Sequence, residues 1–429
     1  MRRGKREPLP AGPSLPAVAQ AVAYHRDPLG VLRRARTHYG PVFTMRFPYK
    51  APVVFVADSG AVDMLLHADP DRAHAGSARR SVLPQASGSS PFGGDGSVHQ
   101  LTRAQMWPGF CPERIATIEP GIAELAATHA ARWPMLRPFR LVEAMRSLCT
   151  EITVRLVLGV SDPDRGARLI DAIRRLLNTP GNPPLPLPGG GDDRAGAAGW
   201  VGDAMFARRS APVRELLFQE LHERRLAGRA GEDVLGAMLG SGEISDGAII
   251  DELLIVLMAA QEPSAIALTN IICELARAPL VAARFRADPS ARRAIIAEVL
   301  RLRPSASAVL RRLTEPMHLA GHALPAGVVI ACPSPLLHRE PTAFPDPDAF
   351  EPARFANGIP AGAPYIPFGG GARRCLGEVL AEAEFRAVLP AVLDRRRFRL
   401  VWPRAERMVV RATVLVPHRG GLVSTTPIG

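Results

Sequence analysis

The sequence predicts a mainly α protein with a minor β-sheet region. Helical patterns fill most of the chain between residues 99 and 302, whereas β-rich runs are short and are confined to the N-terminal part and the last quarter. No internal repeat is visible. The 429 residues are 47% hydrophobic and 22% charged, which excludes a disordered chain and is enough to bury a sizeable core.

The N-terminal part combines a Pro-rich start with a predicted hairpin. Residues 1–30 form a Pro-rich segment. Pro41–Phe47 and Val53–Val56 are β-rich runs on either side of a Pro-containing break, which predicts a β-hairpin. Residues 77–98 are rich in Ser, Gly and Pro, which predicts a long loop.

Helical patterns dominate the rest of the chain. The stretch 178–198 interrupts them with prolines and glycines; we interpret it as a flexible lid loop, and this composition fits a domain linker equally well. Helices are expected at 99–110, 117–135, 140–159, 163–178, 199–227, 246–277, 279–287, 291–302 and 377–393. Short strands are expected at 327–331, 397–402 and 408–416.

Charge and hydropathy restrict the class of partner and the compartment. The chain has 53 Lys and Arg residues against 41 Asp and Glu, a net charge of +12, and its lysines are Lys5 and Lys50. Because the arginines are interspersed with acidic residues, the charge favours solubility and an acidic protein partner over a nucleic acid. The sequence lacks a run of about 18 apolar residues and an apolar signal region, so we expect no membrane span and a cytoplasmic protein.

One of the five cysteines lies in a pattern suited to metal chemistry. The five are widely spaced and include no CxxC pair, so neither a disulfide framework nor a zinc site is indicated. Cys375 closes a Gly-rich run that starts at Phe368, and it precedes an apolar helix whose N-terminus favours a thiolate. The glycines let the backbone approach a flat ligand, and Arg373 adds positive charge beside an anionic one. A thiolate held in this way suits the axial position of haem iron.

The complete pattern resembles a known family. Phe368-x-x-Gly371-x-Arg373-x-Cys375-x-Gly377 is similar to the haem-binding signature of the cytochrome P450 family. The resemblance implies the cytochrome P450 fold, a triangular helix-rich prism that encloses haem b (iron protoporphyrin IX). It also implies that 1–429 is a single haem-thiolate catalytic domain.

Two further motifs stand in the order that the family shows. Glu298-Val-Leu-Arg301 resembles the family's E-x-x-R pair, whose residues share one face of a helix. Arg354, in Phe350-Glu-Pro-Ala-Arg-Phe355, matches the arginine that joins this pair in a buried structural network. Three motifs in one order make a chance match negligible.

The resemblance implies which residues hold the haem. Cys375 is the implied metal ligand. His99 and Arg103 lie four residues apart, as in the family's H-x-x-x-R helix, and are implied partners of the haem propionates. Arg311 matches a third propionate partner, although the adjacent Arg312 could take that place. Further cofactor contacts are implied at Phe368, Gly369, Arg373 and Gly377.

The sequence departs from the family over the distal face of the haem. The family usually has [Ala/Gly]-Gly-x-[Asp/Glu]-Thr there, and this chain has Ala259 and then Ala260 for the glycine, Glu262 for the acid and Pro263 for the threonine. The threonine hydroxyl helps to deliver protons during oxygen activation, and proline has neither a hydroxyl nor an N–H. Ser264 is displaced by about 100° around the helix, so it cannot replace the hydroxyl without local rearrangement. Some members of the family that lack this threonine remain competent monooxygenases.

Three functions remain open from the sequence. The first is monooxygenation (hydroxylation or epoxidation) of a medium-sized, largely apolar molecule in bacterial specialised metabolism, with O2 and with electrons from a ferredoxin and its reductase. The second is non-standard haem-thiolate chemistry: oxidative coupling or cyclisation, a peroxide-driven reaction, or group transfer driven by a substrate leaving group. Pro263 favours this second class. The third is a non-catalytic helper, against which the intact Cys375, His99 and Arg103 count.

Overall fold

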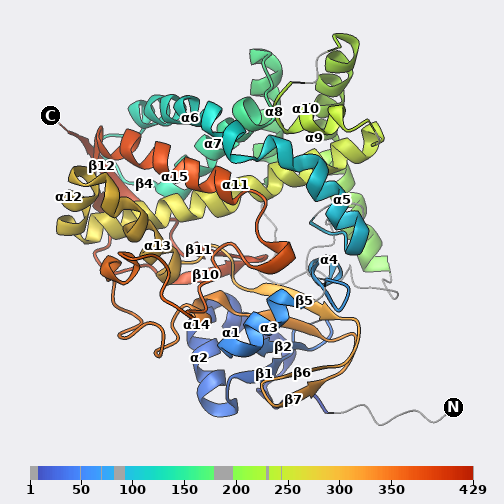
Figure 1. Cartoon of the computed structure of the whole chain (residues 1–429). Helices are drawn as coiled ribbons and strands as arrows, with labels where there is room; N and C mark the ends of the chain where they lie inside the picture. Colours follow the sequence, from blue (N-terminus) through green and yellow to red (C-terminus); the bar gives the residue numbers. More distant parts are fainter. Residues whose placement is uncertain are drawn as a thin grey trace.

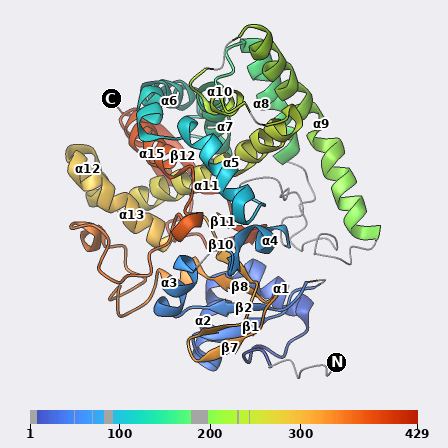
Figure 2. The same cartoon turned by 45° about the vertical axis from the view of Figure 1, so that its right-hand side comes forward.

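A large helical part lies beside a smaller part built on a five-stranded sheet (Figure 1). This computed structural model describes residues 8–48, 50–68, 70–81, 92–177, 197–228, 231–242 and 244–428. In Figure 2, α11 (Asp246–Arg277) passes through the middle of the helical part. The predicted mainly α class with a minor β-sheet region is confirmed.

The other helices of the described residues surround α11 or lie against the sheet. They are α1 (Ala17–Arg26), α2 (Pro28–Tyr39), α3 (Ser59–His67), α4 (Ala75–Arg80), α5 (Gly96–Met106), α6 (Pro112–Arg132), α7 (Leu141–Ile152), α8 (Pro163–Leu177), α9 (Ala197–Leu226), α10 (Val234–Gly240), α12 (Pro279–Ala287), α13 (Arg292–Leu302), α14 (Ser334–Leu337) and α15 (Glu378–Leu393). The bounds of α11 and α12 are those predicted from the sequence.

Strands from both ends of the described chain form the sheets. The five-stranded sheet has the order β1-β2-β8-β5-β3, and a three-stranded sheet has the order β4-β12-β9. The predicted hairpin is confirmed, because β1 and β2 pair antiparallel with Val42 opposite Val56. The strands are β1 (Val42–Met45), β2 (Val53–Val56), β3 (Ala73–His74), β4 (Phe139–Arg140), β5 (Val309–Leu313), β6 (Met317–Leu319), β7 (His322–Leu324), β8 (Val329–Cys332), β9 (Arg396–Leu400), β10 (Met408–Arg411), β11 (Val414–Pro417) and β12 (Leu422–Pro427).

Helix α11 is the central core element. It begins after the N-cap Ser245, whose Oγ accepts a hydrogen bond from the N–H of Ala248 at 3.4 Å. By length and composition α11 is the one helix of the described residues that could cross a membrane, but 67% of its most apolar window is buried inside the protein. Its apolar character is that of a core helix packed against α7, α9 and α15.

The prediction of one long loop over 77–98 is wrong at both ends. Helix α4 continues to Arg80 and α5 already starts at Gly96; residues 82–91 lie outside the described part. The cause is Asp95, whose two carboxylate oxygens accept hydrogen bonds of 2.7 Å from the N–H groups of Gly76 and Ser77 and so start α4. A Ser- and Gly-rich composition did not reveal this distant cap.

The Pro-rich N-terminal segment contains α1 and the first turn of α2, in which Pro28 occupies the first helical position, where its missing N–H costs nothing. One further expectation needs correction. The strand predicted at 408–416 is the hairpin β10–β11, which turns at Ala412 with a φ of 52°. The predicted lid at 178–198 falls almost entirely on residues that the structure does not describe.

Candidate active site

The Gly-rich run forms a tight loop directly before α15. The N–H of Cys375 donates to the carbonyl of Phe368 at 2.9 Å and closes the loop. Gly369 and Gly371 have φ values of 73° and 61°, which other residues rarely adopt. A Cβ on Gly371 would also collide with the backbone carbonyl of Leu66, so this position accepts no side chain.

The thiol of Cys375 is exposed to solvent, yet crowded protein surroundings raise its pKa by partial desolvation. The N–H of Gly377 donates a hydrogen bond to the sulfur and lowers the pKa, whereas the negative charge of Glu378 raises it further. The expectation that the start of α15 alone would favour a thiolate is therefore not met. A coordinated metal ion deprotonates a thiol outright, so the ligand role does not require a lowered pKa in the metal-free chain.

A cluster of arginines surrounds this loop. Arg373 lies in the loop, Arg311 donates to the carbonyls of Leu310 and Gly370, and Arg103 donates to the carbonyl of Arg374 at 2.8 Å. Burial lowers the pKa of Arg311, and burial together with neighbouring arginines lowers the pKa of Arg373 to about 10.

One carboxylate, Asp95, faces this cluster and lies 2.7 Å from the Nη2 of Arg373. Within the described part of the chain, several buried or half-buried guanidinium groups facing this one carboxylate leave an excess of positive charge. The site is therefore suited to a ligand that brings two anionic groups.

Arg79 belongs to the same cluster, although the sequence placed it in a loop. Burial, followed by Arg311 and Arg373, lowers its pKa to about 10, while Cys375 and Asp95 raise it. Its guanidinium lies 4.4 Å from the ring centroid of Phe92. An arginine pair in a Ser- and Gly-rich stretch was the only sequence signal available for it.

His99 lies on α5 beside these arginines and is buried. Burial, and then the positive charges of Arg373 and Arg103, lower its pKa to about 4. His99 is therefore neutral at physiological pH, so it can donate a hydrogen bond but adds no positive charge.

The two adjacent arginines of β5 differ in their surroundings. Arg311 is 2% exposed and reaches toward the Gly-rich loop, whereas Arg312 is opposite His74 of β3 and less buried. Because successive residues of a strand point to opposite faces, Arg311 is the one directed at the loop.

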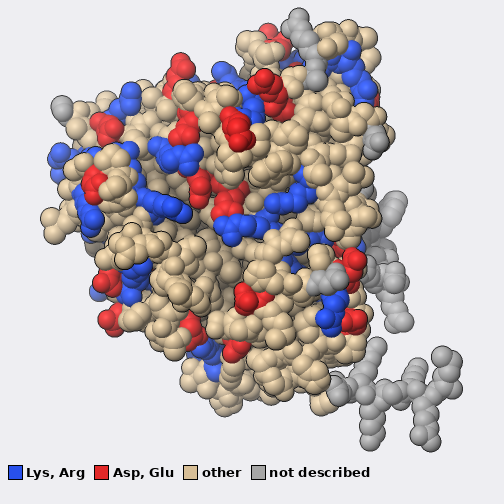
Figure 3. Space-filling model, viewed as in Figure 1, with Lys and Arg blue, Asp and Glu red and all other residues tan. Residues whose placement is uncertain are grey.

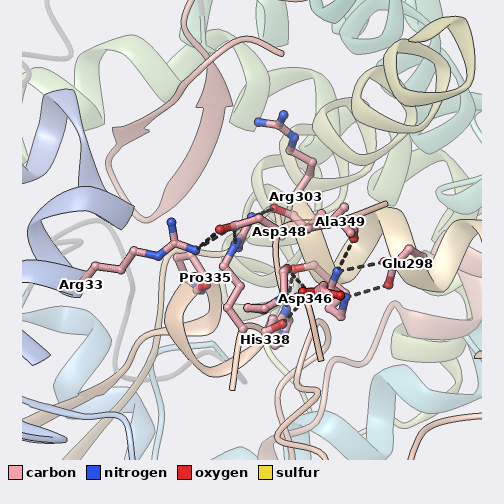
Figure 4. Close-up of polar contacts among 12 residues, drawn as sticks. Arg33, Glu298, Arg303, Pro335, His338, Asp346, Asp348 and Ala349 are labelled. Atoms are coloured by element: carbon pink, nitrogen blue, oxygen red, sulfur yellow. Dashed lines mark hydrogen bonds and ion pairs between the residues drawn. The ribbon is translucent and has the colours of Figure 1, made fainter. Parts of the chain in front are cut away.

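The E-x-x-R pair lies on α13, and its third member, Arg354, comes from the turn Pro352–Phe355. Figure 4 shows Glu298 of this network near His338 and Ala349. Arg301 donates two hydrogen bonds to Glu298, of 2.7 and 2.8 Å, and both side chains are completely buried. The Nε of Arg354 lies 3.6 Å from Glu298, which also accepts a hydrogen bond from the N–H of Glu351. Arg301 also donates hydrogen bonds to the carbonyls of His338, Pro347 and Ala349.

Helix α11 carries the residues that replace the family's oxygen-side motif. Pro263 lies inside the helix and offers no N–H to the carbonyl of Ala259, while its own carbonyl accepts a hydrogen bond of 2.9 Å from Ser305. Glu262 accepts hydrogen bonds from Arg146 of α7 on both oxygens, one of them at 2.6 Å. The sequence did not reveal Arg146, because it lies 116 positions away from its partner.

Known proteins agree with this architecture. A family model described as Cytochrome P450 matches residues 292–422. The protein named cytochrome P450 135B1 from Mycobacterium tuberculosis (strain ATCC 25618 / H37Rv) is 33% identical over 97% of this chain and 91% of its own length. The chain belongs to the cytochrome P450 family.

Other P450s extend the comparison. Cytochrome P450 135A1 of M. tuberculosis is 29% identical over 98% of this chain and 95% of its own length. A cyanobacterial CYP120A1 with bound retinoic acid superposes with a TM-score of 0.80 at 20% identity, over 98% of this chain and all of that one. CYP175A1 from Thermus thermophilus gives 0.74 at 23% identity, over 96% and 98% of the two chains. The predicted P450 fold is confirmed.

The cofactor of this P450 is haem, and the residues present fit it. The accessible thiol of Cys375 suits the iron, and the Gly-rich loop admits a flat ring close to the backbone. The arginine excess suits the two propionates. The protein is thus a P450-type oxidoreductase that acts on a small molecule with a redox partner.

Proposed function

We propose that this P450 is a monooxygenase that hydroxylates or epoxidises a medium-sized, largely apolar molecule in bacterial specialised metabolism. The observation that carries the proposal is the accessible Cys375 thiol within a cluster of arginines. When bound, haem supplies the iron centre at which oxygen is activated.

The roles of the cofactor-binding residues follow from their placement. Cys375 is the proposed iron ligand, with Phe368, Gly369 and Gly377 shaping the loop around it. Arg103 and Arg311 are proposed propionate partners, joined by Arg79 as a further cation and by neutral His99 as a hydrogen-bond donor. Arg373 is shared between this site and Asp95, so Asp95 fixes the position of Arg373 rather than neutralising the whole cluster.

Helix α11 shapes the side of the site where the substrate reacts. Ala259 is exposed and Ala260 is half-buried, so short side chains leave room for a substrate. Pro263 keeps the carbonyl of Ala259 free of its helical partner, and Ser305 holds the carbonyl of Pro263. Glu262 is held by its ion pair with Arg146 of α7 at the edge of this region.

The proposal includes a ferredoxin and its reductase as the electron source. Basic and acidic residues intermingle on the face shown in Figure 3. The side chain of Arg374 in the loop is half exposed, as is that of Arg386 on α15, and Trp107 after α5 is an exposed aromatic residue. Exposed arginines and an aromatic residue are suited to contact with an acidic protein. We also propose that 1–429 acts as one catalytic domain in the cytoplasm, which agrees with the burial of α11.

A second function is favoured by a specific observation, Pro263. Without a threonine hydroxyl at this position, oxidative coupling or cyclisation, peroxide-driven oxidation, or transfer of a substrate's leaving group becomes more favourable relative to an oxygen cycle that consumes protons. The two functions therefore differ in their need for O2 and for a continuous supply of electrons.

The test is turnover of candidate apolar substrates by purified holoprotein under three conditions: reductant with oxygen, peroxide alone, and no oxidant. We expect product only with oxygen and a sustained electron supply, one oxygen atom being incorporated into it. Product formed without electrons, or with peroxide alone at an equal rate, would replace monooxygenation by the second function.

A further inference from the structure

A buried acid, Glu252, lies in the N-terminal half of α11. Its residue is 2% exposed, and its Oε2 has no hydrogen-bond partner among the described residues. A polar atom without a partner in a protein interior is uncommon and calls for a functional explanation. Glu252 is therefore a candidate for contact with a ligand.

Glu252 lies on the face of α11 that also carries Ala259 and Pro263. These residues follow Glu252 by seven and eleven positions, so they fall within about 20° of it around a helix of 3.6 residues per turn. Ala259 is exposed although it lies in the middle of a core helix, and Ile255, between Ala259 and Glu252, is half-buried. The accessible part of this face thus ends at Glu252, about 10 Å along the helix axis from Ala259.

The surroundings of Glu252 favour its neutral form. Burial, and then the negative charge of Asp251, raise its pKa to about 9, and no basic group of the described residues lowers it. Charged groups on the helices packed against α11 are engaged elsewhere: Arg214 of α9 pairs with Asp251 at 2.5 Å, and Asp233, the N-cap of α10, pairs with Arg224 at 2.8 Å. Glu252 is therefore a protonated acid at neutral pH, because no cation lies beside it within the described part of the chain.

We propose that Glu252 is a specificity-determining residue that binds a basic amine of the substrate, whose apolar body lies along Ile255 and Ala259. The inference deepens the proposed monooxygenase function and rests on it. A protonated amine brings both the positive charge and the N–H donor that this carboxyl lacks, and such charge-assisted hydrogen bonds are strong. Binding leaves Glu252 ionised, so its proton is released to solvent. The substrate is then an apolar molecule whose amine lies about 10 Å from the end that faces Ala259.

Isothermal titration calorimetry on the oxidised holoprotein tests this assignment with two probes that differ at one end. They are N,N-dimethyldecylamine, which is cationic at neutral pH, and decan-1-ol, which is neutral; each is titrated near pH 7 and near pH 8. Glu252→Gln preserves the size and the neutral state of the protonated acid, so it should fold, but it cannot ionise. Asp246→Asn is the matched control, because Asp246 lies on the same helix with a partly exposed side chain that pairs with Arg225.

We expect the native protein to bind the amine about tenfold more tightly than the alcohol, or more, on the scale of a buried charge pair. Amine affinity should also rise by up to about tenfold per pH unit, because binding below the pKa of about 9 releases a proton. Both effects should persist in Asp246→Asn and vanish in Glu252→Gln.

Two results overturn the amine site: equal binding of the amine by native protein and Glu252→Gln, or native affinity for the alcohol that equals or exceeds that for the amine. The titration contains no reductant, so it does not depend on turnover. Product formed without oxygen in the turnover test would overturn the monooxygenase function instead, and would leave the binding result in place.

Discussion

Two buried polar groups of residues differ in how their side chains are paired. Glu298 and Arg301 of α13 form an ion pair, whereas Glu384 of α15 and Gln261 of α11 leave polar atoms without a hydrogen-bond partner among the described residues. Glu298 and Arg301 satisfy each other, and backbone groups take up most of their remaining capacity. The carboxyl oxygens of Glu384 on α15 and the Nε2 of Gln261 on α11 are equally buried, and they have no hydrogen-bond partner among the described residues. A paired network resists change and fixes structure, whereas an open cluster retains groups that can exchange protons.

The largest effect is expected from breaking the paired network. Glu298→Ala leaves the guanidinium of Arg301 buried without its carboxylate, which costs about 3–5 kcal/mol. We expect little soluble protein and little bound haem, measured by expression yield and haem content. Arg293→Ala, at a more accessible position on the same helix, is the control and should resemble the native protein. A haem-loaded Glu298→Ala variant with normal melting would show that the network is not structural.

The buried carboxyl of Glu384 should make the stability of the folded protein depend on pH. A carboxyl in the unfolded chain ionises near 4.5, whereas Glu384 in the folded protein has a pKa of about 8, because burial disfavours its charge. Between these pH values the folded state holds the extra proton, so this group's contribution to stability is complete below pH 4.5 and is lost as the pH rises to about 8.

Glu384→Gln removes that titration. We therefore expect the free energy of unfolding of the native protein, relative to this variant, to fall by a few kcal/mol between about pH 5 and pH 8. Denaturant unfolding at several pH values measures the difference, with Glu382→Gln as the control, because Glu382 lies on the same helix with its side chain 52% exposed. Parallel pH profiles for native protein and Glu384→Gln would place the carboxyl in contact with water or a cation.

A smaller effect is expected at Pro263. Pro263→Thr restores the hydroxyl that the family usually has at this position, so it should leave turnover within a few-fold of the native value while raising the yield of product per reductant consumed. The measurement is the ratio of product to NADH. Unchanged coupling would indicate that proton supply does not limit this enzyme.

The sequence predicted the site residues that lie close together along the chain and missed those whose partners lie in distant segments. Cys375 and Arg373 were found because they stand in one short motif, and Glu298 with Arg301 because they share one helix turn. Asp95 and Arg146 were not found, because each takes its partner from a segment far along the chain, as the 116 positions between Arg146 and Glu262 illustrate. Local spacing carries no information about such tertiary pairs.

Glu384 shows the same limit more strongly. Within an apolar helical pattern it would be read as an ordinary charged position, and its burial depends on how α15 packs against α7 and α11. The helix bounds of α11 were predictable from its periodicity, but the loop at 77–98 was not, because a distant carboxylate starts α4.

The central claim is that haem is bound through the thiolate of Cys375, and the spectrum of the reduced carbon-monoxide complex tests it most directly. The account predicts an absorption maximum near the wavelength that gives the family its name, retained in Cys111→Ala and lost in Cys375→Ala. A native spectrum typical of histidine ligation, or a thiolate spectrum that persists in Cys375→Ala, would contradict it.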